Sequence, residues 1–194
     1  MIRSSINLFE TSPYRLIVSG RSNDKVITHL SILAKLLAAR DTRYFLTHAY
    51  FEFENVEDPD DEVTTPTISS SLYSSCLPYY LGLSESLSRD YVREPITTLP
   101  LISSTYGELP AEIGNKFEYL IQCPVGQTGV NGKPFSNADN SKLVGLALVS
   151  AVNPSDPTKD VVWGRMYLDT NEQRIIPTTG AISGRYGITF ELES

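Results

Sequence analysis

Residues 44–54 read YFLTHAYFEFE, and their alternation predicts a β-strand. One side of such a strand would carry Phe45, Thr47, Ala49, Phe51 and Phe53. The other side would carry Leu46, His48, Tyr50, Glu52 and Glu54. Because successive side chains of a strand point to opposite faces, we expect one face on the core and the other facing water or a neighbour.

The last third of the chain repeats this rhythm. Strands are predicted at 117–123, 143–152, 161–168 and 185–192, and an earlier one at 14–18. The apolar run at 143–152 is nearly continuous, so we expect that strand to be covered on both faces. Turns rich in Gly and Pro separate these stretches, among them residues 126–132 with their Asn-Gly pair. Short strands with such turns predict a mainly β fold, an antiparallel β-sandwich or barrel.

One helix is predicted, at about residues 24–40, packed against the β-structure. Asn23 or Asp24 can cap its first turn. Apolar residues then recur at three- and four-residue spacing: Val26, Ile27, Leu30, Leu33, Ala34, Leu37 and Ala38.

The chain is expected to form a single β-rich domain over residues 1–194. Its 194 residues, 41% of them hydrophobic, suffice for one sizeable core. Between about 57 and 110 the pattern weakens into an irregular segment rich in Pro, Ser and Tyr. Such a segment is either mobile or held by a partner.

Charge argues against nucleic acid as a partner and leaves self-association open. The net charge is −7, and no basic stripe is present. Residues 1–43 carry seven basic and three acidic groups, whereas residues 44–118 carry three basic and thirteen acidic groups. These segments would attract each other head to tail in a ring. Alternatively, each only solvates its own surface.

Neither a secretory signal nor a membrane span is expected. The N-terminal residues contain no long apolar stretch, and the longest apolar run, 143–152, is far shorter than a span. Cys76 and Cys123 match no metal or redox spacing, so we expect buried thiols. The protein is expected to be intracellular at synthesis, without a membrane partner.

No motif predicts a catalytic, cofactor or metal site. Residues 129–134 (GVNGKP) resemble a P-loop but lack its first Gly and its hydroxyl, so a hairpin or surface turn is expected. Ser84 lies in an incomplete esterase elbow. His29 and His48 are isolated, and an acidic loop lacks the spacing of an EF-hand: Asp58, Asp60, Asp61 and Glu62. Glu52 and Glu54 share a strand face but define no cleft.

Tyrosines in the weakly patterned middle predict an interface. They are Tyr73, Tyr79, Tyr80, Tyr91 and Tyr106. Tyrosine offers a large contact area, few rotatable bonds and a polar tip, properties that interfaces favour. The alternative is that these rings fold back onto an edge of their own domain.

The order of elements resembles small virion proteins of tailed bacteriophages, of the tail, baseplate, collar or fibre-attachment kind. The likeness rests on residues 23–30 (NDKVITHL), 47–55 (THAYFEFEN) and 129–136 (GVNGKPFS), followed by an apolar strand and an alternating C-terminal strand. It implies multiple symmetric copies, docking to other virion proteins, location in the virion after synthesis in the host cytoplasm, and no enzymatic activity.

We therefore expect a structural or adaptor component that works through oligomerisation and protein–protein docking. One alternative is a carbohydrate- or receptor-binding module in which exposed Tyr and Trp163 stack on sugar rings. A hydrolase with distant paired carboxylates is the other.

Overall fold

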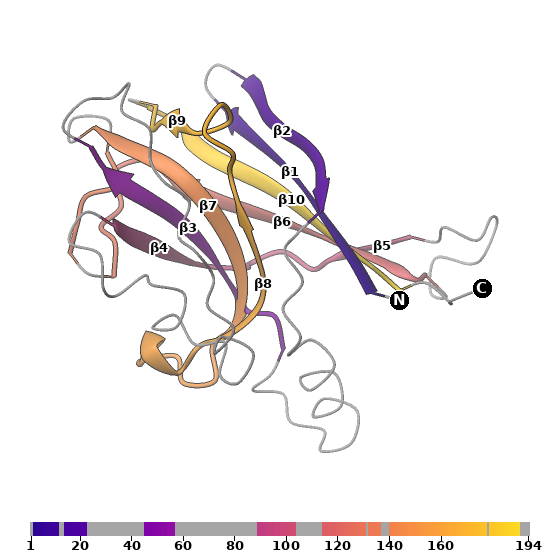
Figure 1. Cartoon of the computed structure of the whole chain (residues 1–194). Coiled ribbons are helices and arrows are strands. Elements are labelled where there is room, and N and C mark those ends of the chain that lie inside the picture. Colours follow the sequence, from indigo (N-terminus) through magenta and orange to yellow (C-terminus); the bar gives the residue numbers. More distant parts are fainter. Residues whose placement is uncertain are drawn as a thin grey trace.

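A computed structural model describes residues 2–11, 14–22, 45–56, 89–103, 114–130, 132–136, 140–177 and 179–190. These residues form ten strands and one short 3₁₀ helix, η6 (Pro157–Lys159). The strands are arranged in two antiparallel sheets (Figure 1). The prediction of a mainly β, antiparallel fold is confirmed. The helix expected at 24–40 lies outside the described residues, as does most of the segment at 57–110.

The first sheet joins both ends of the described chain. Its five strands are, in order, β2 (Tyr14–Ser22), β1 (Ile2–Thr11), β10 (Ala181–Phe190), β6 (Lys116–Pro124) and β5 (Leu101–Ser103). β1 pairs with β10 along nearly its whole length, from Ile2 opposite Phe190 to Glu10 opposite Ile182. The first strand in sequence thus needs the last one to complete its hydrogen bonds.

The second sheet is built around β7. Its order is β4 (Arg89–Pro95), β3 (His48–Asn55), β7 (Ser141–Ser150) and β8 (Val161–Tyr167), and β9 (Arg174–Ile175) also pairs with β7. Every residue of β7 is buried, which confirms that this strand is covered on both faces.

Strands with clear alternation or a continuous apolar run were predicted correctly. Those expected at 117–123, 143–152, 161–168 and 185–192 correspond to β6, β7, β8 and β10, and the stretch at 44–54 contains most of β3. β1 and β4 were not predicted, because β1 has three consecutive polar residues and β4 carries charges on both faces.

Both sheets contribute to one hydrophobic core. The second sheet supplies Phe51, Phe53, Leu146 and Leu148, and the first supplies Leu8, Ile121, Ile182 and Tyr186. These residues lie at alternate positions along their strands, so the two-residue period of the sequence identifies them as core residues.

The second face of β3 was expected to meet water or a neighbour, and water is excluded at its middle positions. Tyr50 and Glu52, on that face, are 0% and 1% exposed. The Tyr50 ring stacks on Tyr91 of β4, and the Glu52 carboxylate accepts hydrogen bonds from Arg165 of β8. Polar residues are tolerated on this buried face because neighbouring strands supply their partners.

Candidate docking site

An apolar cavity of about 510 Å³ lies between residues of both sheets. Strands β6, β8 and β10 supply part of its wall: Phe117, Tyr119, Trp163, Ile188 and Phe190. The segments before β3 and before β5 supply the rest: Phe45, Leu46, Ile96, Thr98, Leu99 and Pro100. Almost all of the wall is therefore aromatic or aliphatic.

Strand alternation places the aromatic side of the wall. Phe117 and Tyr119 are two residues apart on β6 and so share a face, as do Ile188 and Phe190 on β10. Ile188 lies opposite Phe117, and the Phe117 ring meets the Phe190 ring edge-on with centroids 5.8 Å apart. This edge-to-face pair is a favourable geometry that fixes the wall.

The rim of the cavity exposes large apolar side chains. Leu99 is 91% exposed and Phe45 is 54% exposed. Thr98 Oγ1 donates a hydrogen bond of 3.2 Å to the Leu120 carbonyl, which attaches the segment before β5 to β6. Apolar side chains exposed in one place mark interaction sites, because a partner removes them from water.

The size and lining of the cavity suit an apolar group. Ligand sites usually enclose about 300–1,000 Å³ and are mostly apolar with few polar groups. This cavity can therefore accept an aromatic or aliphatic side chain from another molecule. No ionised side chain lines it.

Trp163 belongs to the protein's interior. It is 7% exposed, and its indole Nε1–H donates a hydrogen bond of 2.7 Å to Ser150 Oγ. Stacking on a sugar requires an exposed ring face, so the geometry of Trp163 favours an inner wall of the apolar cavity.

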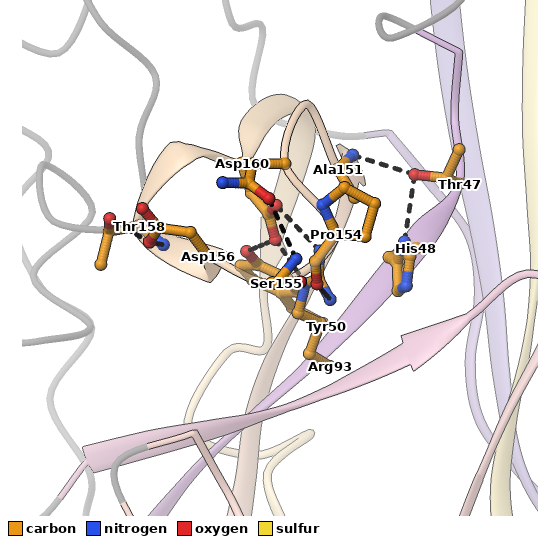
Figure 2. A network of polar contacts seen from close by, with 11 residues as sticks. Thr47, His48, Tyr50, Arg93, Ala151, Pro154, Ser155, Asp156, Thr158 and Asp160 are labelled. Atoms are coloured by element: carbon orange, nitrogen blue, oxygen red, sulfur yellow. Dashed lines mark hydrogen bonds and ion pairs between the residues drawn. The ribbon is translucent and has the colours of Figure 1, made fainter.

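A second cluster of interacting groups is polar and surrounds Asp160 (Figure 2). The Arg93 guanidinium donates to both carboxylate oxygens, with Nε–Oδ2 at 2.6 Å and Nη2–Oδ1 at 3.0 Å. The Tyr50 hydroxyl donates to the same carboxylate, and Arg93 also reaches the Pro154 carbonyl at 3.2 Å. Asp160 is fully buried, so these donors compensate its charge.

Burial keeps the two tyrosines beside this cluster protonated. The pKa of Tyr50 rises far above its usual range through burial and through the nearby Tyr91. Burial also raises the pKa of Tyr91 to about 12. Both hydroxyls therefore stay protonated at physiological pH. The hydrogen bonds of the cluster hold β3 and β4 to the segment leading into β8.

His48 lies at the edge of this cluster. Its Nδ1 is 3.0 Å from Thr47 Oγ1, which accepts a hydrogen bond of 2.9 Å from the Ala151 amide (Figure 2). Burial lowers the pKa of His48, and the positive charge of Arg93 lowers it further while Asp160 opposes them. His48 therefore resists protonation in the folded state.

The carboxylates considered for sugar hydrolysis are each joined to an arginine. Arg165 Nε donates to Glu52 Oε2 at 2.9 Å, and its guanidinium lies 3.9 Å from the Tyr167 ring centroid. Arg89 Nε donates to Glu54 Oε2 at 2.8 Å. Both pairs bridge strands of the second sheet, a structural use of these carboxylates.

Residues 126–130 and 132–136 form the turn expected for the P-loop-like stretch. Gly126 and Gly132 have φ values of 92° and 86°, and Thr128 forms a β-bridge with Pro134. The Lys133 amide donates to Asp90 Oδ2 at 2.9 Å, and its Nζ donates to the Arg89 carbonyl at 3.2 Å. Lys133 thus attaches this turn to β4.

The predicted interface tyrosines are only partly placed. Tyr73, Tyr79, Tyr80 and Tyr106 lie outside the described residues. Tyr91 is 4% exposed and stacks on Tyr50 with ring centroids 4.2 Å apart. Its ring packs within its own chain, as the alternative for these tyrosines requires, because its position on β4 points it at the buried second face of the sheet.

Of the other candidate residues from the sequence, some lie outside the described residues and others lie within them. His29, Cys76, Ser84 and the acidic residues at 58–62 lie outside the described residues. Cys123 is a buried free thiol whose pKa is raised, chiefly by burial and also by Glu94. Within the ranges described, no three His, Cys, Asp or Glu side chains converge as metal ligands would.

The cavity was not predicted from the sequence. One signal does point to its rim: residues 95–107 (PITTLPLISSTYG) contain no charged side chain and include Leu99, Leu101 and Ile102. A long uncharged stretch with apolar residues in an exposed connection is typical of a docking surface.

Comparison with known proteins gives no match to any family model, curated protein or solved structure. Among the described residues, no helix has the length and apolarity needed to cross a bilayer.

Proposed function

We propose that this chain is a non-catalytic structural or adaptor component of a bacteriophage particle, from its tail, baseplate, collar or fibre attachment. Its two sheets pack face to face as a β-sandwich that carries the apolar cavity. The cavity receives an apolar side chain from a neighbouring virion protein.

One observation carries this proposal: the cavity of about 510 Å³ has rim residues as exposed as Leu99, at 91%. Leaving a full leucine side chain in water forgoes about 1.5–3 kcal/mol relative to burying it. A partner that covers Leu99 and Phe45 recovers this free energy, and assembly proteins depend on such contacts.

Incorporation into particles tests the proposal. A tagged copy produced during phage infection should co-sediment with purified particles, and electron microscopy should locate the tag on the tail, baseplate, collar or fibre attachment. Leu99→Asp should lower incorporation at least tenfold, because an aspartate at the rim opposes burial in an apolar contact.

The matched control is Val130→Asp, which places the same charge at a 40% exposed position in the turn after β6. It should be incorporated like the parent. A chain that stays entirely out of particles while particles assemble normally would contradict the proposed function.

A further inference from the structure

Glu94, near the end of β4, is a carboxylate without a partner inside the described part of the chain. Among the acidic side chains that the structure describes, it alone accepts no hydrogen bond and forms no ion pair. The others each have a partner: Glu52, Glu54, Asp90, Glu118, Asp156, Asp160, Asp169 and Glu172. A partly buried carboxylate that lacks a partner costs free energy, because it loses water and gains nothing in return.

The charge of Glu94 is therefore disfavoured in the free protein. Its side chain is half-buried, and burial raises the pKa of its carboxyl above the ordinary value. A cation supplied by another molecule would offset this cost, because an opposite charge nearby favours the ionised form.

The side chain of Glu94 lies between the two sheets, next to the apolar cavity. Glu94 pairs with Ala49, a core residue of β3, so it belongs to the core face of β4. Its charge also raises the pKa of Cys123, a core residue of β6. Ile96, two residues further on, lines the cavity, and its amide donates to the Thr47 carbonyl at 2.8 Å, which continues the pairing of β4 with the chain before β3. Side chains two residues apart in an extended strand share a face and lie about 6–7 Å apart.

We infer that the partner segment that fills the cavity is basic as well as apolar: it inserts an apolar side chain into the cavity and pairs a lysine or arginine with Glu94. This inference rests on the proposed function and names the chemistry of the partner at the same site. An extended segment carries every second side chain on one face, at the spacing that separates Ile96 from Glu94. One short stretch of the partner can therefore make both contacts.

The charge of the surrounding chain favours such a partner. Residues 44–118 supply Glu94 and most of the cavity lining, and they carry three basic and thirteen acidic groups. The described lining contains no cation, and the aromatic faces of Phe117 and Tyr119 attract positive charge. An acidic segment would be repelled by this surface.

Three capped tripeptides test the charge requirement: acetyl-Lys-Gly-Phe-amide, acetyl-norleucine-Gly-Phe-amide and acetyl-Glu-Gly-Phe-amide. Each offers the same phenylalanine to the cavity, and only the charge two residues away differs. Trp163 is the single tryptophan of the chain and lines the cavity, so its fluorescence reports binding. The lysine peptide should bind about threefold more tightly than the norleucine peptide, the effect of a partly exposed ion pair, and the glutamate peptide should bind most weakly.

Variants of Glu94 assign the preference to its carboxylate. Glu94→Gln should abolish the preference for lysine without weakening the norleucine peptide. Glu94→Lys should reverse it, so that the glutamate peptide binds best. Glu172→Gln removes the same charge at a residue that does not line the cavity, and it should leave all three affinities unchanged. Circular dichroism of each variant confirms that the fold is retained.

Unfolding of the free protein supplies a second readout. A raised carboxyl pKa means that the folded chain binds the proton more readily than the unfolded chain, so the charge of Glu94 opposes folding at neutral pH. Glu94→Gln should therefore leave the urea midpoint unchanged or higher. A lower midpoint would show that the carboxylate stabilises its own chain, which contradicts the inference.

The outcomes separate the two proposals. Equal affinities of the parent for the lysine and norleucine peptides, or no binding of the lysine peptide, overturn the basic partner. Incorporation of the tagged chain into particles, and its dependence on Leu99, still decide the proposed function. A chain that prefers the lysine peptide through Glu94 but stays out of particles would refute the virion role alone.

Discussion

Gly129 stands where a side chain would collide with a buried carboxylate. A Cβ atom on Gly129 would lie 2.2 Å from Asp90 Oδ2. That oxygen accepts the Lys133 amide, and Oδ1 accepts the Tyr91 amide at 2.7 Å. The close approach of the turn to β4 therefore requires glycine.

Gly129→Ala should lower the free energy of unfolding by about 1–3 kcal/mol, because Asp90 must move and weaken these hydrogen bonds. Urea denaturation followed by circular dichroism measures the change. Val130→Ala, at an exposed position of the same turn, should stay within about 0.5 kcal/mol of the parent. Equal stability of Gly129→Ala and the parent would contradict the close contact.

The stability of the protein also depends on the ion pair between Glu52 and Arg165. Both side chains are almost fully buried, at 2% and 1% exposed. Arg165→Leu should destabilise the protein by about 3–5 kcal/mol, because Glu52 would remain buried without its cation.

The double variant with Glu52→Leu and Arg165→Leu should recover most of that loss, because no charge is then left in the interior. Thermal unfolding and urea titration of the parent, single and double variants measure the difference. A double variant as unstable as Arg165→Leu would show that packing, and not charge, dominates at this position.

At the level of elements, the Asp160 cluster joins three segments that are distant in sequence. β3 contributes Tyr50, β4 contributes Arg93, and Asp160 immediately precedes β8. His48 at its edge gives this part of the sheet a pH dependence, because burial and Arg93 lower the pKa of its imidazole.

A lowered pKa means that the unfolded chain binds the His48 proton more readily than the folded chain. Stability should therefore fall as the pH drops below the ordinary histidine value of about 6.5, and His48 should contribute no pH dependence above it. His48→Gln should make the unfolding free energy less steep in this acidic window. The comparison of urea midpoints across pH for both proteins measures the effect. If the unfolding free energy of His48→Gln depends on pH as steeply as that of the parent, groups other than His48 cause the pH dependence.

The whole molecule depends on the pairing of its first and last strands. β1 lies between β2 and β10 in the first sheet, and Leu8 belongs to the core shared by both sheets. A chain lacking residues 1–11 would lose the neighbour of β2 in the described sheet and the pairing of β10 on the same side.

This truncation should abolish the cooperative unfolding transition, because it removes an internal strand and a fully buried leucine. Differential scanning calorimetry measures the transition. Leu8→Ala provides a milder test in the full chain and should cost about 2–5 kcal/mol. A cooperative transition of parental size in the truncated chain would show that the first sheet does not need β1.

Strands with a clear hydrophobic pattern could be predicted from the sequence, and strands without one could not. Alternation in Phe117 to Cys123 and the apolar run from Leu143 identified β6 and β7, because a strand's two faces meet different environments. β4 was not predicted, because charged residues occupy both of its faces: Arg89, Asp90, Arg93 and Glu94. Their partners Glu54, Lys133 and Asp160 lie far away in sequence, so local composition could not explain them.

The sequence by itself determined the mainly β class, the strands with a regular period and the identity of most core residues, since these depend on local spacing alone. Only the tertiary structure decided that the second face of β3 is buried, that Tyr91 packs inside its own chain, and that an apolar cavity lies beside an uncharged strand edge. Each of these features arises where residues distant in the chain meet, and strand pairing, which hydrophobic spacing does not encode, sets which residues those are.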